Sequence, residues 1–407
     1  MSRPARVRRR PALRGLFARA VGIILGIALA GGGIVAMQAP WKHPTATVHV
    51  AFHWLSGPNG DVTLAWPSIG SAAIDIPSLR ALDGHDDEVV PIASLTKMMT
   101  VYVALQDMPL SIGETGPCHV VTSDDVETYQ EMSQIDESSV PVFVGEQLCE
   151  IDLLNGVLVH SAGNYAVMLA NMVAGSNSAF ITLMNGEAAT LGLAGTSYAD
   201  VTGFSPQSVS TALDQVRLAA LLMQSPLVRS IVIQSSVTLP DVGAETSFTP
   251  DVGIDNVIGV KSGRTLAAGG CDAMAMTFQD GSVTRVAYVV VLGQRGGDLL
   301  TPAGDAALAL ANSAVAERSH YTLRAHRAMG ELAYANGRVG YGLTSSHELW
   351  WWPSQHLSVT IHTRRLNGVI HRGEIVGSLS LSGALRRTYA LRAYGSLTPP
   401  SLLERLR

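Results

Sequence analysis

The feature that most restricts the fold is a pair of apolar segments joined by a tight-turn sequence. Ala273–Phe278 and Val283–Leu292 are separated by Gln279–Ser282, which contains Asp280-Gly281. An Asp-Gly pair between two apolar runs favours a β-hairpin. Val257–Lys261 precedes the pair as a further strand. We therefore predict an antiparallel sheet in this part of the chain.

Helical patterns lie on both sides of these strands. Apolar residues recur there at helical spacing, and Asn177 or Ser178 is the expected N-cap of one helix. The expected helices are Ile92–Leu105, two runs within Ile151–Ala174 broken near Ser161–Asn164, then Ala179–Leu193 and Ala303–Glu317. Helices followed by a hairpin-rich sheet indicate an α+β fold.

Residues 319–407 have a different pattern. Short alternating runs, Leu357–Thr363 and Glu374–Leu381, are separated by Gly, Asn and His, which predicts a small all-β C-terminal domain with a tail. The apolar run Trp350–Trp352 is expected to pack against the preceding domain, with docking on a membrane or glycan as the alternative. Residues 61–318 are expected to form the preceding domain. Residues 40–60, which are rich in Pro and Gly, are expected to form a linker.

The N-terminus predicts export. Seven arginines within residues 1–19 precede the uncharged stretch Ala20–Ala39, which is long enough to cross a bilayer. Positive charge flanking such a segment stays in the cytoplasm. We expect 1–19 to be a cytoplasmic stub and 20–39 a single transmembrane anchor, with the remaining chain extracytoplasmic. A cleaved signal segment, giving a secreted protein, is the alternative.

Charge is divided unevenly along the chain. The net charge of −5 combines +7 in residues 1–37, −20 in residues 38–317 and +8 in residues 318–407. An acidic central domain does not favour nucleic-acid binding. The basic C-terminal strands are expected to present a solvated face, with an anionic surface as the alternative. Lysine is scarce: Lys42, Lys97 and Lys261 are the three lysines among 28 Lys and Arg residues.

Two of these lysines stand in sequences suited to acyl transfer. Ser94 and Lys97 are three residues apart at the start of an apolar helix, so they share one face. A buried amine with a lowered pKa can take the serine proton, whereas a guanidinium cannot. Lys261-Ser262-Gly263 ends a predicted strand and offers a cation, a hydroxyl and a close backbone approach. The alternatives are a helix N-cap with a solvated lysine, and a strand-end charge with a turn glycine.

These motifs resemble those of the low-molecular-weight penicillin-binding proteins, the serine-type D-alanyl-D-alanine carboxypeptidases. The likeness extends over about Trp66–Glu317, is actinobacterial in style, and includes Pro91–Thr100, Tyr198–Ala212 and Ile258–Cys271. It implies the DD-peptidase/β-lactamase-like fold, in which an antiparallel sheet is flanked by helices beside an α-helical subdomain. It also implies an enzyme that needs no cofactor or metal.

The resemblance implies a role for each site residue. Ser94 is the nucleophile and Lys97 the general base, while Lys261, Ser262, Gly263 and Arg264 bind the substrate's terminal carboxylate and line the oxyanion hole. The substrates are peptidoglycan stem peptides ending in D-Ala-D-Ala, and β-lactams are inhibitors. The resemblance further implies a Cys118–Cys149 disulfide and a buried free Cys271.

The middle motif departs from the family pattern of Ser-x-Asn. Ser161 is in the serine position, but Gly163 stands where the family has Asn, and Asn164 is one residue late. Ser161 is expected to relay protons and Asn164 to contact substrate if the backbone shifts locally. Restoring Asn at position 163 is expected to raise activity. An impaired homologue that binds peptidoglycan or a partner is therefore the alternative function, and a β-lactamase is the third.

Overall fold

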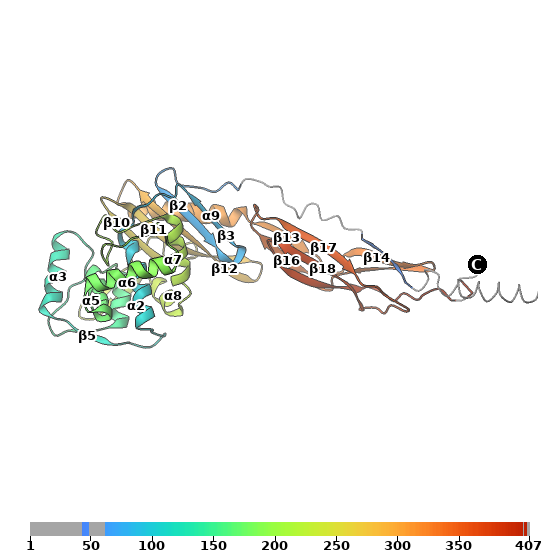
Figure 1. Ribbon diagram of the computed structural model, residues 1–407, viewed down its shortest axis with the longest axis horizontal. Coiled ribbons are helices and arrows are strands. Elements are labelled where there is room, and N and C mark those ends of the chain that lie inside the picture. The colour runs from blue at the N-terminus through green and yellow to red at the C-terminus, as the bar shows by residue number, and fades with distance from the viewer. Residues whose placement is uncertain (1–42, 49–61, 402, 405–407) are drawn as a thin grey trace, which may run out of the picture. The chain divides into compact units, whose positions relative to one another are not determined.

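The computed structural model describes residues 43–48, 62–401, 403 and 404, so the predicted stub 1–19 and the predicted membrane segment 20–39 lie outside the described residues. The chain divides into two compact units, which are described separately (Figure 1). One unit contains the described residues 62–321 and 348–356. The other contains the described residues 43–48, 322–347, 357–401, 403 and 404.

The larger unit is built on a five-stranded antiparallel sheet in the order β10-β11-β12-β2-β3. In that order the strands are Val257–Thr265, Gly269–Asp280, Val283–Gln294, Ser71–Ile76 and Ala81–His85. The predicted hairpin is confirmed, since Asp280 lies opposite Val283 in the β11–β12 pair. Strand β2 pairs with β12, and β3 completes the sheet by pairing with β2.

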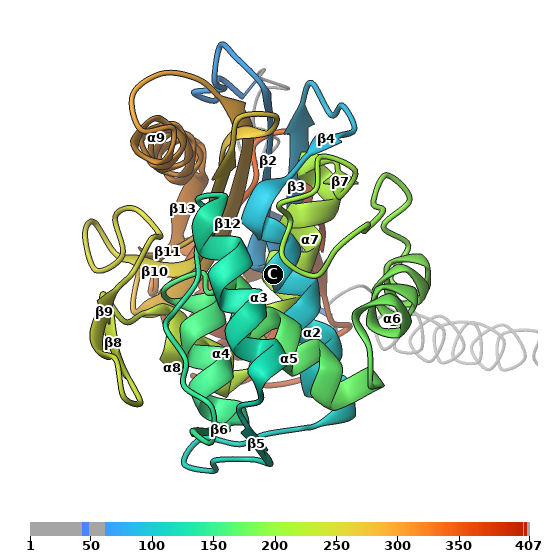
Figure 2. The ribbon, with the colours of Figure 1, turned by 90° about the vertical axis from the view of Figure 1, so that its left-hand side faces the viewer.

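Strand β12 shows why both faces of this sheet are covered. Side chains alternate between the two faces of a strand, and here both sets are apolar. Ala287, Val289 and Val291 belong to one core cluster, and Tyr288, Val290 and Leu292 belong to the other. Helix α9 (Leu300–Glu317) covers the first face, and α7 (Ala212–Leu222) packs on the second (Figure 2).

The helical layer follows the predicted breaks closely. A 3-10 turn, η3 (Ala93–Leu95), leads into α2 (Thr96–Asp107), and the predicted break at residues 161–164 separates α4 (Glu150–Leu158) from α5 (Gly163–Ala174). The N-cap of α6 is neither of the two expected residues: the side chain of Ser176 accepts a hydrogen bond from the Ala179 N–H. The other helical segments are α3 (Ser123–Gln134), α6 (Asn177–Thr190), α8 (Pro226–Val232) and η2 (Pro77–Leu79).

Short paired strands tie the loops of this unit. They are β4 (Val90–Pro91) with β7 (Val209–Ser210), β5 (Cys118–Val120) with β6 (Gln147–Cys149), and β8 (Ser236–Leu239) with β9 (Gly243–Thr246). Cys118 and Cys149 face each other across the β5–β6 pair and form a disulfide. Cys271 is a buried free thiol, and burial raises its pKa to about 12.

The tryptophan run belongs to the larger unit. Trp352 is buried in the apolar cluster beneath α9, and Trp350 packs at its edge. The predicted packing of this run against the preceding domain is therefore confirmed. β13 (Ser319–Leu323) and β16 (His347–Trp351), which carries the first two tryptophans, form a two-stranded sheet.

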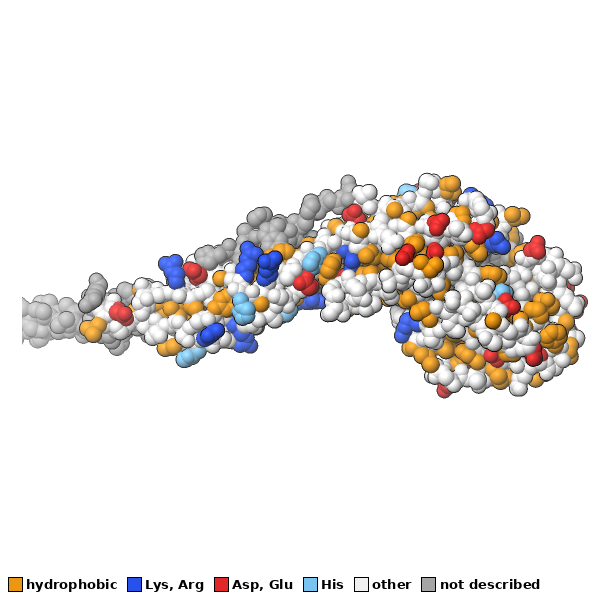
Figure 3. Space-filling model, turned by 180° about the vertical axis from the view of Figure 1, so that it is seen from behind, with side chains coloured by type: hydrophobic (Ala, Val, Ile, Leu, Met, Phe, Trp, Pro, Cys, Tyr) orange, Lys and Arg blue, Asp and Glu red, His pale blue; other side chains and the backbone are white. Residues whose placement is uncertain are grey.

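The second unit is a six-stranded sheet in the order β1-β14-β15-β19-β18-β17. In that order the strands are Thr45–Val48, Ala328–Tyr334, Gly337–Gly342, Arg387–Ala393, Ile375–Gly383 and Leu357–Thr363. Strand β1 comes from within the predicted linker and pairs with β14. The exposed arginines of this unit include Arg338, Arg364, Arg365 and Arg387, and blue side chains recur along its surface in Figure 3.

Within the part of the chain that the structure describes, no one helix has both the length and the apolar character needed to cross a membrane. Helices α5 and α6 meet that test only as a pair, and an 84° bend separates them.

Candidate active site

The Ser94 turn places a hydroxyl beside a buried amine. Ser94 lies in η3, directly before α2, and Lys97 is in the first turn of that helix. Lys97 Nζ donates hydrogen bonds to Ser94 Oγ at 2.9 Å and to the Thr202 carbonyl oxygen at 3.0 Å. The expected pairing of these two side chains on one helical face is therefore present, and the Thr202 carbonyl holds the amine toward the serine.

Burial tunes Lys97 toward the neutral form. Its side chain is 1% exposed, and Met98 and Met99 beside it are fully buried. Burial lowers the pKa of Lys97 from 10.5 to about 8, although the carboxylates of Glu137 and Asp200 act in the opposite direction. An amine near this pKa can accept a proton at neutral pH, as acylation by a serine requires.

Strand β10 brings the second motif against the Ser94 turn. A β-carbon on Gly263 would lie less than 3.0 Å from the Ser94 backbone nitrogen, so only glycine permits this approach. Lys261 is fully buried, and its Nζ donates to the Ser262 carbonyl oxygen at 2.7 Å. Burial lowers the pKa of Lys261 well below its usual range, and the nearby Lys97 lowers it further.

Two cavities open beside Ser94. The smaller, of about 60 Å³, is lined by Ser94, Ser138, Ser161, Phe248, Ser262, Gly263, Arg264 and Leu300. The larger, of about 600 Å³, shares Ser94, Ser138 and Arg264 and continues past Glu137, Gly203 and Leu299. The structure therefore brings both predicted motifs and Ser161 to one opening.

Some polar side chains of this opening have a hydrogen-bond partner among the described residues, and Ser161 does not. The Ser262 hydroxyl donates to the Phe248 carbonyl oxygen at 2.7 Å. Arg264 is exposed, and its guanidinium donates to the Asp298 carbonyl oxygen at 2.8 Å. The Ser161 hydroxyl is buried and has no hydrogen-bond partner among the described residues. A ligand is the natural partner for Ser161, since a buried hydroxyl without one is costly.

Asn164 does not line either cavity. Its side-chain oxygen accepts from the Val140 N–H at 3.0 Å, and its side-chain nitrogen donates to the Val140 carbonyl at 2.8 Å. We therefore reassign Asn164 from substrate binding to support of the segment around Val140. The physical reason is that the one-residue shift re-aims the amide on the helix, where it is buried and bonded to Val140.

Several residues at the site escaped the sequence analysis. The Thr202 carbonyl oxygen accepts a hydrogen bond from Lys97 Nζ. Gly203 lies against the turn before α2, where any β-carbon would collide with the Ala93 carbonyl oxygen. The Thr202-Gly203 pair in the 198–212 segment was the available signal. Glu137 and Ser138 come from a polar stretch after α3, where nothing in the sequence distinguishes them from a solvated loop.

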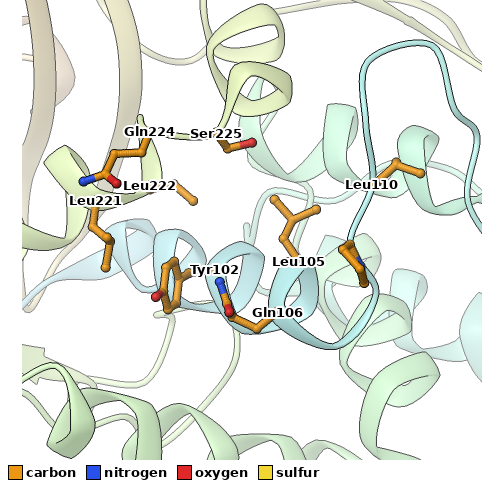
Figure 4. Close-up of a pocket in the computed structure, with 9 residues that line it drawn as sticks. Tyr102, Leu105, Gln106, Leu110, Leu221, Leu222, Gln224 and Ser225 are labelled. Carbon is orange, nitrogen blue, oxygen red and sulfur yellow. The ribbon is translucent and has the colours of Figure 1, made fainter.

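A separate cavity of about 250 Å³ lies between α2 and the end of α7 (Figure 4). It is lined by Tyr102, Leu105, Gln106, Pro109, Leu110, Leu221, Leu222, Gln224 and Ser225. None of the residues predicted for catalysis or substrate binding lines it.

A buried lysine bonded to a serine hydroxyl beneath a cavity is the arrangement of serine acyl transfer. The chain belongs to the D-alanyl-D-alanine carboxypeptidase family, peptidase S11, whose model matches residues 73–295. These enzymes are serine DD-peptidases, and the family includes carboxypeptidases and endopeptidases.

The chain matches part of the length of two curated relatives. The chain is 37% identical to a D-alanyl-D-alanine endopeptidase of Pseudomonas aeruginosa over 35% of this chain and 43% of the relative. It is 32% identical to the D-alanyl-D-alanine carboxypeptidase DacC of Escherichia coli over 54% of this chain and 57% of the relative. The chain thus spans about half the length of these two relatives.

Solved structures share the fold. Penicillin binding protein 6B from Escherichia coli matches with a TM-score of 0.58 and 18% identity, over 85% of this chain and 99% of that one. The D-alanyl-D-alanine carboxypeptidase from Mycobacterium tuberculosis matches with a TM-score of 0.54 and 24% identity, over 63% and 94%. The expected α+β DD-peptidase fold with a C-terminal β-rich domain is therefore confirmed.

Proposed function

We propose that this protein is a serine-type D-alanyl-D-alanine carboxypeptidase that trims the stem peptides of peptidoglycan. The observation that carries the proposal is the 2.9 Å hydrogen bond from the buried Lys97 amine to Ser94 Oγ. Ser94 lines the smaller cavity, which Ser262 and Gly263 of the second motif also line. The carboxypeptidase DacC of Escherichia coli supports this assignment, whereas the relative from Pseudomonas aeruginosa is named an endopeptidase.

Each group has a defined task in the proposed reaction. Neutral Lys97 takes the Ser94 proton, and Ser94 Oγ attacks the carbonyl of the penultimate D-Ala. Lys97 passes the proton to the departing D-Ala, and water later releases the acyl group. The N–H groups of Ser94 and Arg264 face the developing oxyanion, while Lys261 and the Ser262 hydroxyl favour the substrate carboxylate. β-lactams acylate Ser94 by the same attack.

We also propose a place for the reaction. The segment 20–39 anchors the chain in the cell membrane, with the Ser94 site on the extracytoplasmic side, where peptidoglycan lies. Secretion after cleavage of that segment is the competing assignment. Fractionation of cells expressing the full chain, followed by N-terminal sequencing, separates the two: an anchored protein stays in the membrane fraction with its arginines intact.

The test of the proposed activity uses the full chain in detergent with a fluorescent penicillin and diacetyl-Lys-D-Ala-D-Ala. We expect a covalent adduct and released D-Ala, both lost in Ser94→Ala. The absence of any adduct on a folded protein refutes an acyl-enzyme. Rapid disappearance of the adduct without D-Ala release indicates a β-lactamase.

One observation favours a second candidate, an impaired homologue that binds peptidoglycan. The middle motif has Gly163 in the Asn position, and Asn164 bonds to Val140 instead of facing the cavity. Such a protein would form the adduct with penicillin and release little or no D-Ala, so the same experiment distinguishes it from the carboxypeptidase.

A further inference from the structure

The space left by the glycine of the middle motif is occupied by another side chain. Gly163 begins α5, and a β-carbon placed on it would lie 2.8 Å from Glu137 Oε1 and 3.1 Å from the Ser138 carbonyl oxygen. Glu137 follows α3 and reaches the site from a different segment of the chain. A carboxylate thus stands where the family places an amide.

Glu137 has a free oxygen inside the site. Its Oε1 is buried and has no hydrogen-bond partner among the described residues. The side chain lines the larger cavity together with Ser94 and Gly203. A buried carboxylate oxygen without a partner is costly, so its presence in a cavity beside a nucleophile calls for a ligand or a reacting water.

The surroundings of Glu137 allow it to gain and lose a proton. Burial raises its pKa, while the charge of Lys97 lowers it and the charge of Asp200 raises it. The single hydroxyl proton of Thr202 is donated to Asp200 Oδ2 at 3.0 Å. Thr202 therefore has no hydroxyl proton left to donate to Glu137, and burial, Lys97 and Asp200 set the protonation of this carboxyl group.

We propose that Glu137 is a catalytic residue of this site, the proton acceptor for the water that releases the acyl group from Ser94. The proposal rests on the proposed peptidase function. In this step Glu137 takes a proton from water, and the water oxygen bonds to the acyl carbon. The bond from that carbon to Ser94 Oγ then breaks, and the proton returns from Glu137 through Lys97 to Ser94 Oγ.

The isosteric variant Glu137→Gln tests this role. It keeps the side-chain shape and removes the proton acceptor, so formation of the fluorescent penicillin adduct should stay within about threefold of the wild type. The half-life of the adduct should lengthen at least about tenfold, since general base catalysis is worth roughly 10² to 10⁴. The steady-state rate of D-Ala release should also fall, because each new turnover must wait for the acyl group to leave Ser94. Glu131→Gln, on the exposed face of α3, is the matched control and should change neither rate.

Other results have defined meanings. An unchanged adduct half-life in Glu137→Gln, or loss of adduct formation in a variant that keeps its melting temperature, overturns the proposal. Glu137→Asp keeps the carboxylate and should recover part of the release rate; failure to exceed Glu137→Gln also overturns it. The proposed function fails separately, when the wild type itself forms no adduct.

Gly163→Asn provides an independent approach to the same residue. The added side chain must displace Glu137, so activity should fall, contrary to the gain expected from the sequence alone. The adduct half-life should lengthen as in Glu137→Gln, and combining the two changes should add no further lengthening. Full additivity of the two effects, or a shorter half-life in Gly163→Asn, contradicts the inference.

Discussion

Replacing Lys97 with Arg is the sharpest test of the acylation chemistry. The guanidinium keeps a positive charge near Ser94 and cannot act as a base at neutral pH. Lys97 is 1% exposed and has a pKa of about 8 instead of 10.5. At pH 7 roughly a tenth of such an amine is neutral, against roughly one part in three thousand for an unshifted lysine. Burial therefore favours the reactive form by roughly 3 kcal/mol.

We expect Lys97→Arg to slow acylation by about a thousandfold or more, within the range that general base catalysis supplies. The assay is the second-order rate of adduct formation between the full chain and a fluorescent penicillin, quantified on gels. Lys42→Arg, which changes the lysine beyond the predicted membrane segment, is the matched control and should leave the rate unchanged. If Lys97→Arg acylates within about tenfold of the wild type while keeping its melting temperature, the assignment of Lys97 as base is wrong.

Three further outcomes follow from the structure. Because neutral Lys97 is the reactive form and its pKa is about 8, the acylation rate should rise roughly fiftyfold between pH 6 and pH 8; a flat profile of adduct formation contradicts this. Gly263→Ala should slow adduct formation at least about a hundredfold, because its β-carbon would collide with the Ser94 backbone; a near-normal rate shows that the turn can move. Cys118→Ser with Cys149→Ser opens a link between residues 31 apart and should lower the free energy of unfolding by about 3–4 kcal/mol. Denaturant titration measures that loss, and an unchanged midpoint contradicts it.

Local sequence signals predicted most elements around the site. The turn sequence Gln279–Ser282 and the apolar runs around it predicted the β11–β12 hairpin. The break between α4 and α5 was predicted at residues 161–164. The resemblance also implied that the segments at Cys118 and Cys149 are short neighbouring strands, as β5 and β6 are, but β4, β7, β8, β9 and the helices α3, α7 and α8 were not anticipated. Their patterns are weak or short, and contacts with distant segments decide their conformation.

The site was predicted unevenly for a physical reason. Ser94 and Lys97 are three residues apart, so helix geometry alone brings their side chains together. The sequence could not show that Asn164 does not face the substrate. Its amide bonds to Val140, which lies 24 residues earlier in the chain, and only the folded chain brings the two together. Glu137 was missed because a glutamate in a polar loop has no local pattern that separates a solvated side chain from one directed into a cavity.

The sequence by itself determined the chemistry available to this protein: a serine with a lysine one helical turn away, a second lysine ending a strand, and apolar alternation that requires a covered sheet. These are local properties, set by the period of a helix or strand. Only the tertiary structure decided which groups share one space. The Thr202 carbonyl directs Lys97 toward Ser94, Gly263 admits the Ser94 backbone, and Glu137 fills the volume that Gly163 leaves open. Each of those contacts joins segments far apart in the chain, so close packing of the folded chain creates them and sequence spacing does not.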